Sequence, residues 1–156
     1  MMDILDITPQ KGIAFNYRGA PLDPELRPLW RISLLVLIIM KLCSGNKANV
    51  KKLQALYSLV ASKKKREIFL SPMDNHYLLN IRFDPIVDRA IDMGLGYSLF
   101  ELDDAKSVIL SDKGLAFGKR IEEDNCIFIL EKEFMNKFKK SYFTDKRIND
   151  LITGER

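Results

Sequence analysis

The stretch from Ile32 to Met40 is the most hydrophobic part of the chain, and an arginine and a lysine bracket it. A membrane-spanning helix needs about 20 consecutive apolar residues, so this stretch is too short for that role. Pro24 and Pro28 are typical of a helix N-terminus, and Gly45 suits the left-handed position after a helix C-terminus. We therefore predict a buried central helix over residues 26–43.

The composition is that of one globular domain. The chain has 156 residues, of which 47% are hydrophobic and 29% are charged. These values exclude a collagen, a low-complexity chain and a disulfide scaffold. Cys43 and Cys126 stand in apolar segments without CxxC spacing, so we expect two reduced core thiols in a cytoplasmic protein. The acidic N-terminus has no apolar core of the signal-peptide type.

The rest of the chain predicts helices interrupted by one hairpin. Periodic apolar residues and helix-capping residues indicate most of the helices, and alternation with a turn indicates the hairpin. The expected helices are residues 50–62, capped by Asn49, a short helix over 74–81, one over 85–93 ended by Gly94 and Gly96, one from Ser111, a long helix or helix pair from Asn125 towards Tyr142, and a short one after Asp145; the expected hairpin strands are 97–102 and 107–110, and a short strand is possible at 13–17.

The segment Gly94-Leu-Gly, the hairpin and Leu110-Ser-Asp-Lys-Gly-Leu-Ala together resemble the winged-helix family. In that family a helix ending in Gly-Leu precedes a two-stranded wing, and the second wing strand runs into Leu-Thr-x-Lys-Gly and a helix. Ser111 replaces the usual threonine here, and either hydroxyl can cap a helix. The resemblance covers residues 26–122 and implies a mainly α fold with a small β-hairpin, a winged helix-turn-helix. The alternative is a generic α+β domain with a hairpin.

A narrower resemblance involves the proline-rich opening Pro21–Pro28, the following Leu29-Trp-Arg-Ile-Ser-Leu-Leu, and Asn46-Lys-Ala-Asn before a helix. Over residues 21–62 the chain resembles the small middle components of three-component ABC-ATPase systems, which include Lamassu-type anti-phage systems. The resemblance implies an adaptor that docks on an SMC-like or Rad50-like ATPase, with a separate effector, often a nuclease, in the same system. The resemblance also implies that DNA is contacted through the complex. It identifies no interface residue in this chain.

The predicted third helix bears on whether the chain binds DNA. In DNA-binding winged helices this helix lies in the major groove. Here it carries Asp84, Asp88 and Asp92 against the single base Arg89. Phosphates line both rims of the groove and repel carboxylates. We therefore take Asp88, Arg89 and Asp92 as candidate partner-binding residues, with a solvated acidic face as the alternative.

Two other groups are candidate binding residues. The net charge is +4, and Lys63, Lys64, Lys65 and Arg66 form the densest basic run. They are candidate phosphate contacts, with a solvated charge run as the alternative. Lys137, Lys139 and Lys140 form a second basic group, although Phe134 and Phe138 beside them are typical of a core or interface stripe. Arg27 and Trp30 would suit a protein-binding anchor if exposed, and Trp30 would otherwise pack in the core.

No pattern in the chain predicts catalysis. His76 is the only histidine, and we expect it at the surface or at a helix end. Gly114 to Arg120 lacks the spacing and the hydroxyl of a phosphate loop. We expect an N-terminal arm (1–25), a winged-helix domain (26–124) and a C-terminal helical extension (125–156). The predicted function is a cytoplasmic, non-enzymatic adaptor without cofactor, metal, membrane or small-molecule substrate; a DNA-binding transcription regulator is the alternative.

Overall fold

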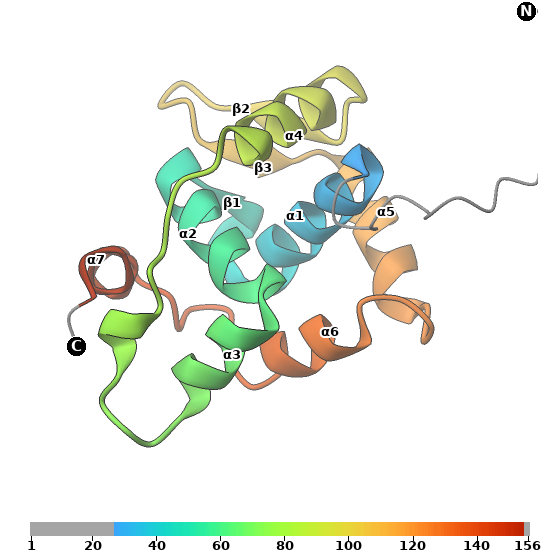
Figure 1. Ribbon diagram of the computed structural model, residues 1–156. Helices are drawn as coiled ribbons and strands as arrows, with labels where there is room; N and C mark the ends of the chain where they lie inside the picture. Colours follow the sequence, from blue (N-terminus) through green and yellow to red (C-terminus); the bar gives the residue numbers. More distant parts are fainter. Residues whose placement is uncertain (1–26, 155–156) are drawn as a thin grey trace, which may run out of the picture.

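The computed structural model describes residues 27–154, and their fold is mainly helical with a small three-stranded antiparallel sheet (Figure 1). The predicted arm, residues 1–25, lies outside this range. No helix within residues 27–154 combines the length and apolarity needed to cross a membrane. The elements in chain order are α1 (Pro28–Leu42), η4 (Ser44–Asn46), β1 (Lys47–Ala48), α2 (Val50–Ala61), α3 (Lys63–Leu70), η5 (His76–Leu78), α4 (Pro85–Gly96), β2 (Phe100–Leu102), β3 (Val108–Leu110), α5 (Asp112–Glu123), α6 (Ile129–Met135) and α7 (Asp145–Thr153).

Helix α1 is the centre of the core, as the hydrophobic stretch predicts. Every residue from Ile32 to Ile39 is buried, so the helix is enclosed on all sides. Helices α2, α4, α5 and α6 and strand β3 all contact it. A helix that is apolar all round is stable only when neighbours cover every face. Gly45, at φ 70°, ends this part of the chain in the predicted left-handed conformation.

The sheet joins two distant parts of the sequence. Strand β3 lies in the middle, with β1 and β2 antiparallel on either side. Lys47 is opposite Ile109 in one pair, and Phe100 is opposite Leu110 in the other. The hairpin β2–β3 is confirmed, with shorter strands than predicted. Strand β1 was not predicted, because its two residues are too few to show the alternation of apolar and polar side chains that is typical of a strand.

Three predicted helix starts are confirmed by their side-chain caps. The Asn49 side chain accepts a hydrogen bond from Lys52 N, the Asp84 carboxylate from Ile86 N, and the Ser111 hydroxyl from Gly114 N. Each of these caps supplies an acceptor for a backbone N–H that has no partner within the helix. The positions of α2, α4 and α5 thus follow from local chemistry.

Helix α3 was not among the predicted helices, and it contains the basic run Lys63–Arg66. The Ser62 side chain accepts from Lys65 N and starts a new helix at Lys63. A Ser N-cap is a common helix start, but four consecutive basic residues gave no apolar period to reveal it.

Helix α4 is longer than predicted, because it continues through Gly94 to Gly96. Gly94 has a helical backbone and lies under the ring of Phe100, where an added Cβ would be 2.3 Å from the ring carbons. The glycine therefore permits close packing of β2 on α4. The left-handed residue comes later, at Ser98, with φ 62°.

Two predicted helices are shorter in the structure than expected. The segment 74–81 contains only the 3-10 turn η5, and the long helix expected from Asn125 is reduced to α6. Around residues 136–144 the aromatic rings Phe138, Tyr142 and Phe143 pack on one another within 5.3 Å, which favours a folded-back chain over a straight helix. Residues 125–154 contribute buried side chains to the same core as α1, so the expected boundary at residue 124 does not separate two cores.

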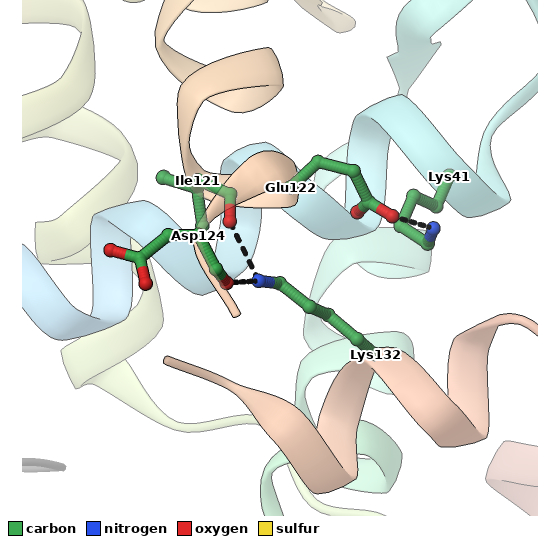
Figure 2. Close-up of polar contacts among 5 residues, drawn as sticks. All are labelled: Lys41, Ile121, Glu122, Asp124 and Lys132. Atoms are coloured by element: carbon green, nitrogen blue, oxygen red, sulfur yellow. Dashed lines mark hydrogen bonds and ion pairs between the residues drawn. The ribbon is translucent and has the colours of Figure 1, made fainter. Parts of the chain in front are cut away.

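A polar junction holds α5 against α1 and α6 (Figure 2). The Nζ atom of Lys41 on α1 lies 2.8 Å from Oε1 of Glu122 on α5. From α6, Lys132 donates to the carbonyl oxygens of Ile121, at 2.6 Å, and Asp124, at 2.5 Å. A cation at a helix C-terminus neutralises carbonyls that have no partner within the helix. These contacts fix where the chain turns back after α5.

The two cysteines differ, which corrects one expectation. Cys43 is buried as predicted, whereas Cys126 is exposed in the loop before α6. Burial raises the pKa of the Cys43 thiol to about 11, although Lys52 and Lys140 lower it by a smaller amount.

Substitution of Gly114 by alanine should destabilise the fold. An added Cβ would meet the backbone oxygen of Leu99 at 2.1 Å, and backbone cannot move aside as a side chain can. We expect Gly114→Ala to lower the free energy of unfolding by about 1–3 kcal/mol in urea titrations. Gly96→Ala is the matched control, because nothing lies within 4 Å of its added Cβ and alanine favours a helix. Equal stabilities for the two variants would contradict the packing described here.

The native protein should expose one reactive thiol. A pKa of about 11 leaves on the order of one thousandth of Cys43 as thiolate at pH 8, and burial also blocks access. Titration with a disulfide reagent should show one fast thiol in the native protein and both after denaturation. Cys126→Ser should abolish the fast reaction. Two fast thiols in the native protein would show that Cys43 is accessible.

Candidate functional site

The surface formed by α4 and the hairpin is the candidate site, and a buried glutamine holds it in place. Gln54 on α2 is 2% exposed. Its Nε2 donates to the backbone oxygen of Asp84 at 3.0 Å and to Oδ1 of Asp88 at 2.9 Å. Its Oε1 accepts from Asp84 N at 2.9 Å. Three hydrogen bonds from one side chain therefore fix the first turn of α4 on α2.

The outer face of α4 is acidic. Asp84, Asp88, Arg89 and Asp92 are all exposed, as the sequence predicts, whereas Val87, Ala90 and Ile91 are buried. The face thus carries three carboxylates and one guanidinium. Of these carboxylates, Asp88 accepts from Gln54 and Asp84 caps the helix, which leaves Asp92 the only one with no hydrogen bond from the described residues.

Apolar side chains border this acidic face, which we call the α4 face. Phe83 before the helix and Tyr97 after it are each 53% exposed, and Met93 on the helix is 37% exposed. Sequence reasoning missed all three as site residues. An apolar residue directly before an N-cap usually packs against the helix, so the exposure of Phe83 had no signal in the sequence.

The hairpin that follows α4 adds further acidic groups. Glu101 and Asp104 are exposed, and Leu102 is 50% exposed. The carboxylate of Asp103 is used internally, since it accepts from Ser107 N at 2.8 Å and lies 3.7 Å from Lys47 Nζ. The turn is closed further by Lys106, whose N–H donates to the Asp103 carbonyl.

The basic run does not form one exposed cluster. Lys63 and Lys64 are exposed, and Lys63 lies 4.0 Å from Glu67. Lys65 Nζ donates to the Ser58 hydroxyl at 2.7 Å, and both burial and the nearby Arg82 lower the pKa of Lys65.

The expectation of a phosphate contact fails for Arg66. This residue is buried, and it donates to the carbonyl of Val60 and lies 4.0 Å from Glu131. The physical reason is its place on the inner side of α3, where the guanidinium satisfies a carbonyl at the end of α2. Within this basic run, Lys63 and Lys64 are the exposed residues that stay candidates for phosphate contact.

Trp30 packs inside the fold, as one of its two interpretations predicts. It is half-buried, and its ring centroid lies 5.1 Å from that of Phe128. Arg27 is exposed at the N-cap of α1. Arg27 and Trp30 therefore do not form a protein-binding anchor based on an exposed tryptophan ring.

The second basic group borders an aromatic cluster. Phe134 and Phe138 lie 5.1 Å apart and both pack against Phe69, which agrees with the expected core stripe. Lys137 and Lys139 are exposed, and Lys140 donates to the Asn46 side chain at 2.5 Å.

The described residues form neither a metal site nor a phosphate loop. In residues 27–154 no group of three or more His, Cys, Asp or Glu side chains is placed to hold a metal ion. Gly114 and Gly118 lie within α5, and an added Cβ at Gly118 would be 3.0 Å from Val36 and Met40 of α1. These glycines therefore serve close packing of α5.

The chain was compared with models of protein families, with curated proteins and with solved structures. None of the three comparisons finds a match. A proposal of function therefore depends on the chain's own residues and their arrangement.

Replacement of Gln54 should loosen α4. In Gln54→Leu the backbone N–H of Asp84 and the carboxylate of Asp88 lose their partner, and we expect a loss of about 1–3 kcal/mol in the free energy of unfolding. Lys51→Leu is the control, because this exposed residue lies on the same helix. Urea unfolding measures both. A Gln54→Leu variant as stable as the control would mean that the three hydrogen bonds contribute little.

Proposed function

We propose that this chain is a winged helix-turn-helix protein acting as a non-enzymatic adaptor, which docks through the α4 face on a larger protein. The element order supports the fold assignment: a helix, a short strand, a second helix, a later helix and then a hairpin, with β3 between β1 and β2. In this assignment α1, α2 and α4 are the three helices of the motif. Residues 62–84, with α3, are an insertion between the last two.

The observation that carries the adaptor role is the chemistry of the α4 face. In a DNA-binding winged helix this face would enter the major groove. Three carboxylates against one guanidinium would meet the phosphates there with repulsion. Exposed Phe83, Met93 and Tyr97 beside them suit a protein partner, since interfaces are enriched in aromatic residues and methionine.

The partner that we propose is an SMC-like or Rad50-like ATPase of a bacterial anti-phage defence system, in which a separate effector, often a nuclease, also takes part. This identity comes from the resemblance of residues 21–62 to the middle components of such systems. The α4 face adds one requirement: the complementary surface should be apolar with a basic rim, because the exposed charges here are mainly acidic.

A DNA-binding transcription regulator is the second candidate. The exposed Lys63 and Lys64 favour it, since neutralising phosphate requires only positive charge. That candidate predicts salt-dependent binding of duplex DNA by the isolated protein, which is weakened by Lys63→Ala combined with Lys64→Ala.

The adaptor proposal is tested by capture of the tagged protein from its native host after nuclease treatment, with mass spectrometry of the proteins retained. A large coiled-coil ATPase should be retained. Asp92→Lys combined with Met93→Lys should reduce its recovery by about 10-fold or more, since the changes place two cations on the α4 face. Asp88 is left intact, because its substitution would also disturb the Gln54 contact.

Glu123→Lys is the control, since it reverses an exposed acidic residue on α5 and should leave recovery unchanged. Circular dichroism should find both variants folded. Full recovery of the ATPase by the folded Asp92→Lys, Met93→Lys variant would exclude the α4 face. If the captured protein retained no protein partner but protected duplex DNA from the nuclease, the result would favour a transcription regulator.

A further inference from the structure

A cleft lined by aromatic residues opens between the end of α3, η5, residues 138–143 and α7. Its volume is about 420 Å³. Pockets for small molecules commonly measure about 300–1,000 Å³, so the cleft is large enough for one ligand of modest size. Residues at the end of α3 and on α7 line the cleft, and these two helices lie on the opposite side of the molecule from α4 and the hairpin (Figure 1).

Flat rings form much of the cleft. Phe143 is buried, whereas Phe69, Phe138 and Tyr142 are half-buried. His76 stacks on Phe69 with their centroids 5.2 Å apart and their planes 16° from parallel. Half-buried rings around an open space leave π faces that a planar ligand can cover, and nucleobases stack on such faces without regard to sequence.

Three polar side chains, His76, Arg147 and Asp150, also line the cleft, and the described residues do not use them fully. The guanidinium of Arg147 lies 4.2 Å from the centroid of the Tyr142 ring. Stacking on a ring leaves the N–H groups at its edge able to donate. Within residues 27–154 the Arg147 guanidinium, the Asp150 carboxylate and the His76 ring nitrogens form no ion pair or hydrogen bond with another residue.

These groups match the parts of one ligand class. Arginine recognises phosphate through paired N–H donors, and a histidine that lines the same cleft can donate as well. A carboxylate accepts hydrogen bonds from ribose hydroxyls or from a base amino group. The aromatic rings that line the same cleft could stack on a nucleobase. A purely apolar ligand would use only the aromatic rings, and inorganic phosphate would use only the donors, whereas a nucleotide can use the donors, the carboxylate and the rings.

We propose that this cleft binds a nucleotide, with the base among Phe69, Phe138 and Tyr142, the phosphate on Arg147 and His76, and a ribose or base donor on Asp150. The ligand is either a free nucleotide or one unit of a single-stranded nucleic acid, because the two share this chemistry. The site goes beyond the adaptor function and does not depend on it. It also departs from the expectation that the chain binds no small molecule.

The test is isothermal titration calorimetry of the full-length chain with AMP, adenosine, inorganic phosphate and an adenine hexanucleotide. AMP or the hexanucleotide should bind saturably and more tightly than adenosine or phosphate. Arg147→Ala should weaken that binding by about 10-fold or more, and should leave the affinity for adenosine unchanged. Arg147 is exposed, so the variant should keep its fold, which thermal unfolding verifies.

Lys146→Ala is the matched control, since it removes an exposed cation one residue away that does not line the cleft. Binding of AMP as tight as that of the hexanucleotide supports a free nucleotide. Binding of the hexanucleotide alone, lost in Arg147→Ala, supports a single strand. Binding of neither, or equal losses in Arg147→Ala and Lys146→Ala, would overturn the proposal.

Discussion

The complete enclosure of α1 is the constraint on which the fold depends. A helix buried from Ile32 to Ile39 without interruption cannot leave any face in water, so its neighbours must surround it. Helices from both halves of the chain do so, and Gly118 lets α5 approach α1 closely. Lys41 of α1 pairs with Glu122 of α5, and Lys132 of α6 donates to two carbonyl oxygens at the end of α5, so these charged side chains tie α5 to α1 and α6.

The same enclosure sets the position of the α4 face. Helix α4 covers one side of α1 with Val87, Ala90 and Ile91, so its acidic side must face outward. Gln54 then fixes the first turn through three hydrogen bonds. A rigid surface pays little conformational entropy when a partner binds, which suits a docking role. The proposed nucleotide cleft is built differently, from rings on segments that pack around α3 and α7.

Local chemistry explains what could be predicted from the sequence. The central helix, the helix starts that follow Asn49, Asp84 and Ser111, and the hairpin all arise from short-range patterns, and the structure confirms them. The burial of Arg66 and the exposure of Cys126 depend on long-range packing, for which neighbouring residues give no signal. The acidic face of α4 was predictable because charge alone defines it. The aromatic cleft was not, since its rings come from segments far apart in the sequence.

The most direct test of a docking role for the α4 face is hydrogen exchange, measured by mass spectrometry on the free protein and on the captured complex. If the α4 face docks on the partner, peptides that cover residues 83–107, which span α4 and the hairpin, should exchange more slowly in the complex, with little change in α3. Protection confined to α3 and α6, with unchanged exchange across residues 83–107, would contradict docking through the α4 face and place the interface at α3 and α6 instead.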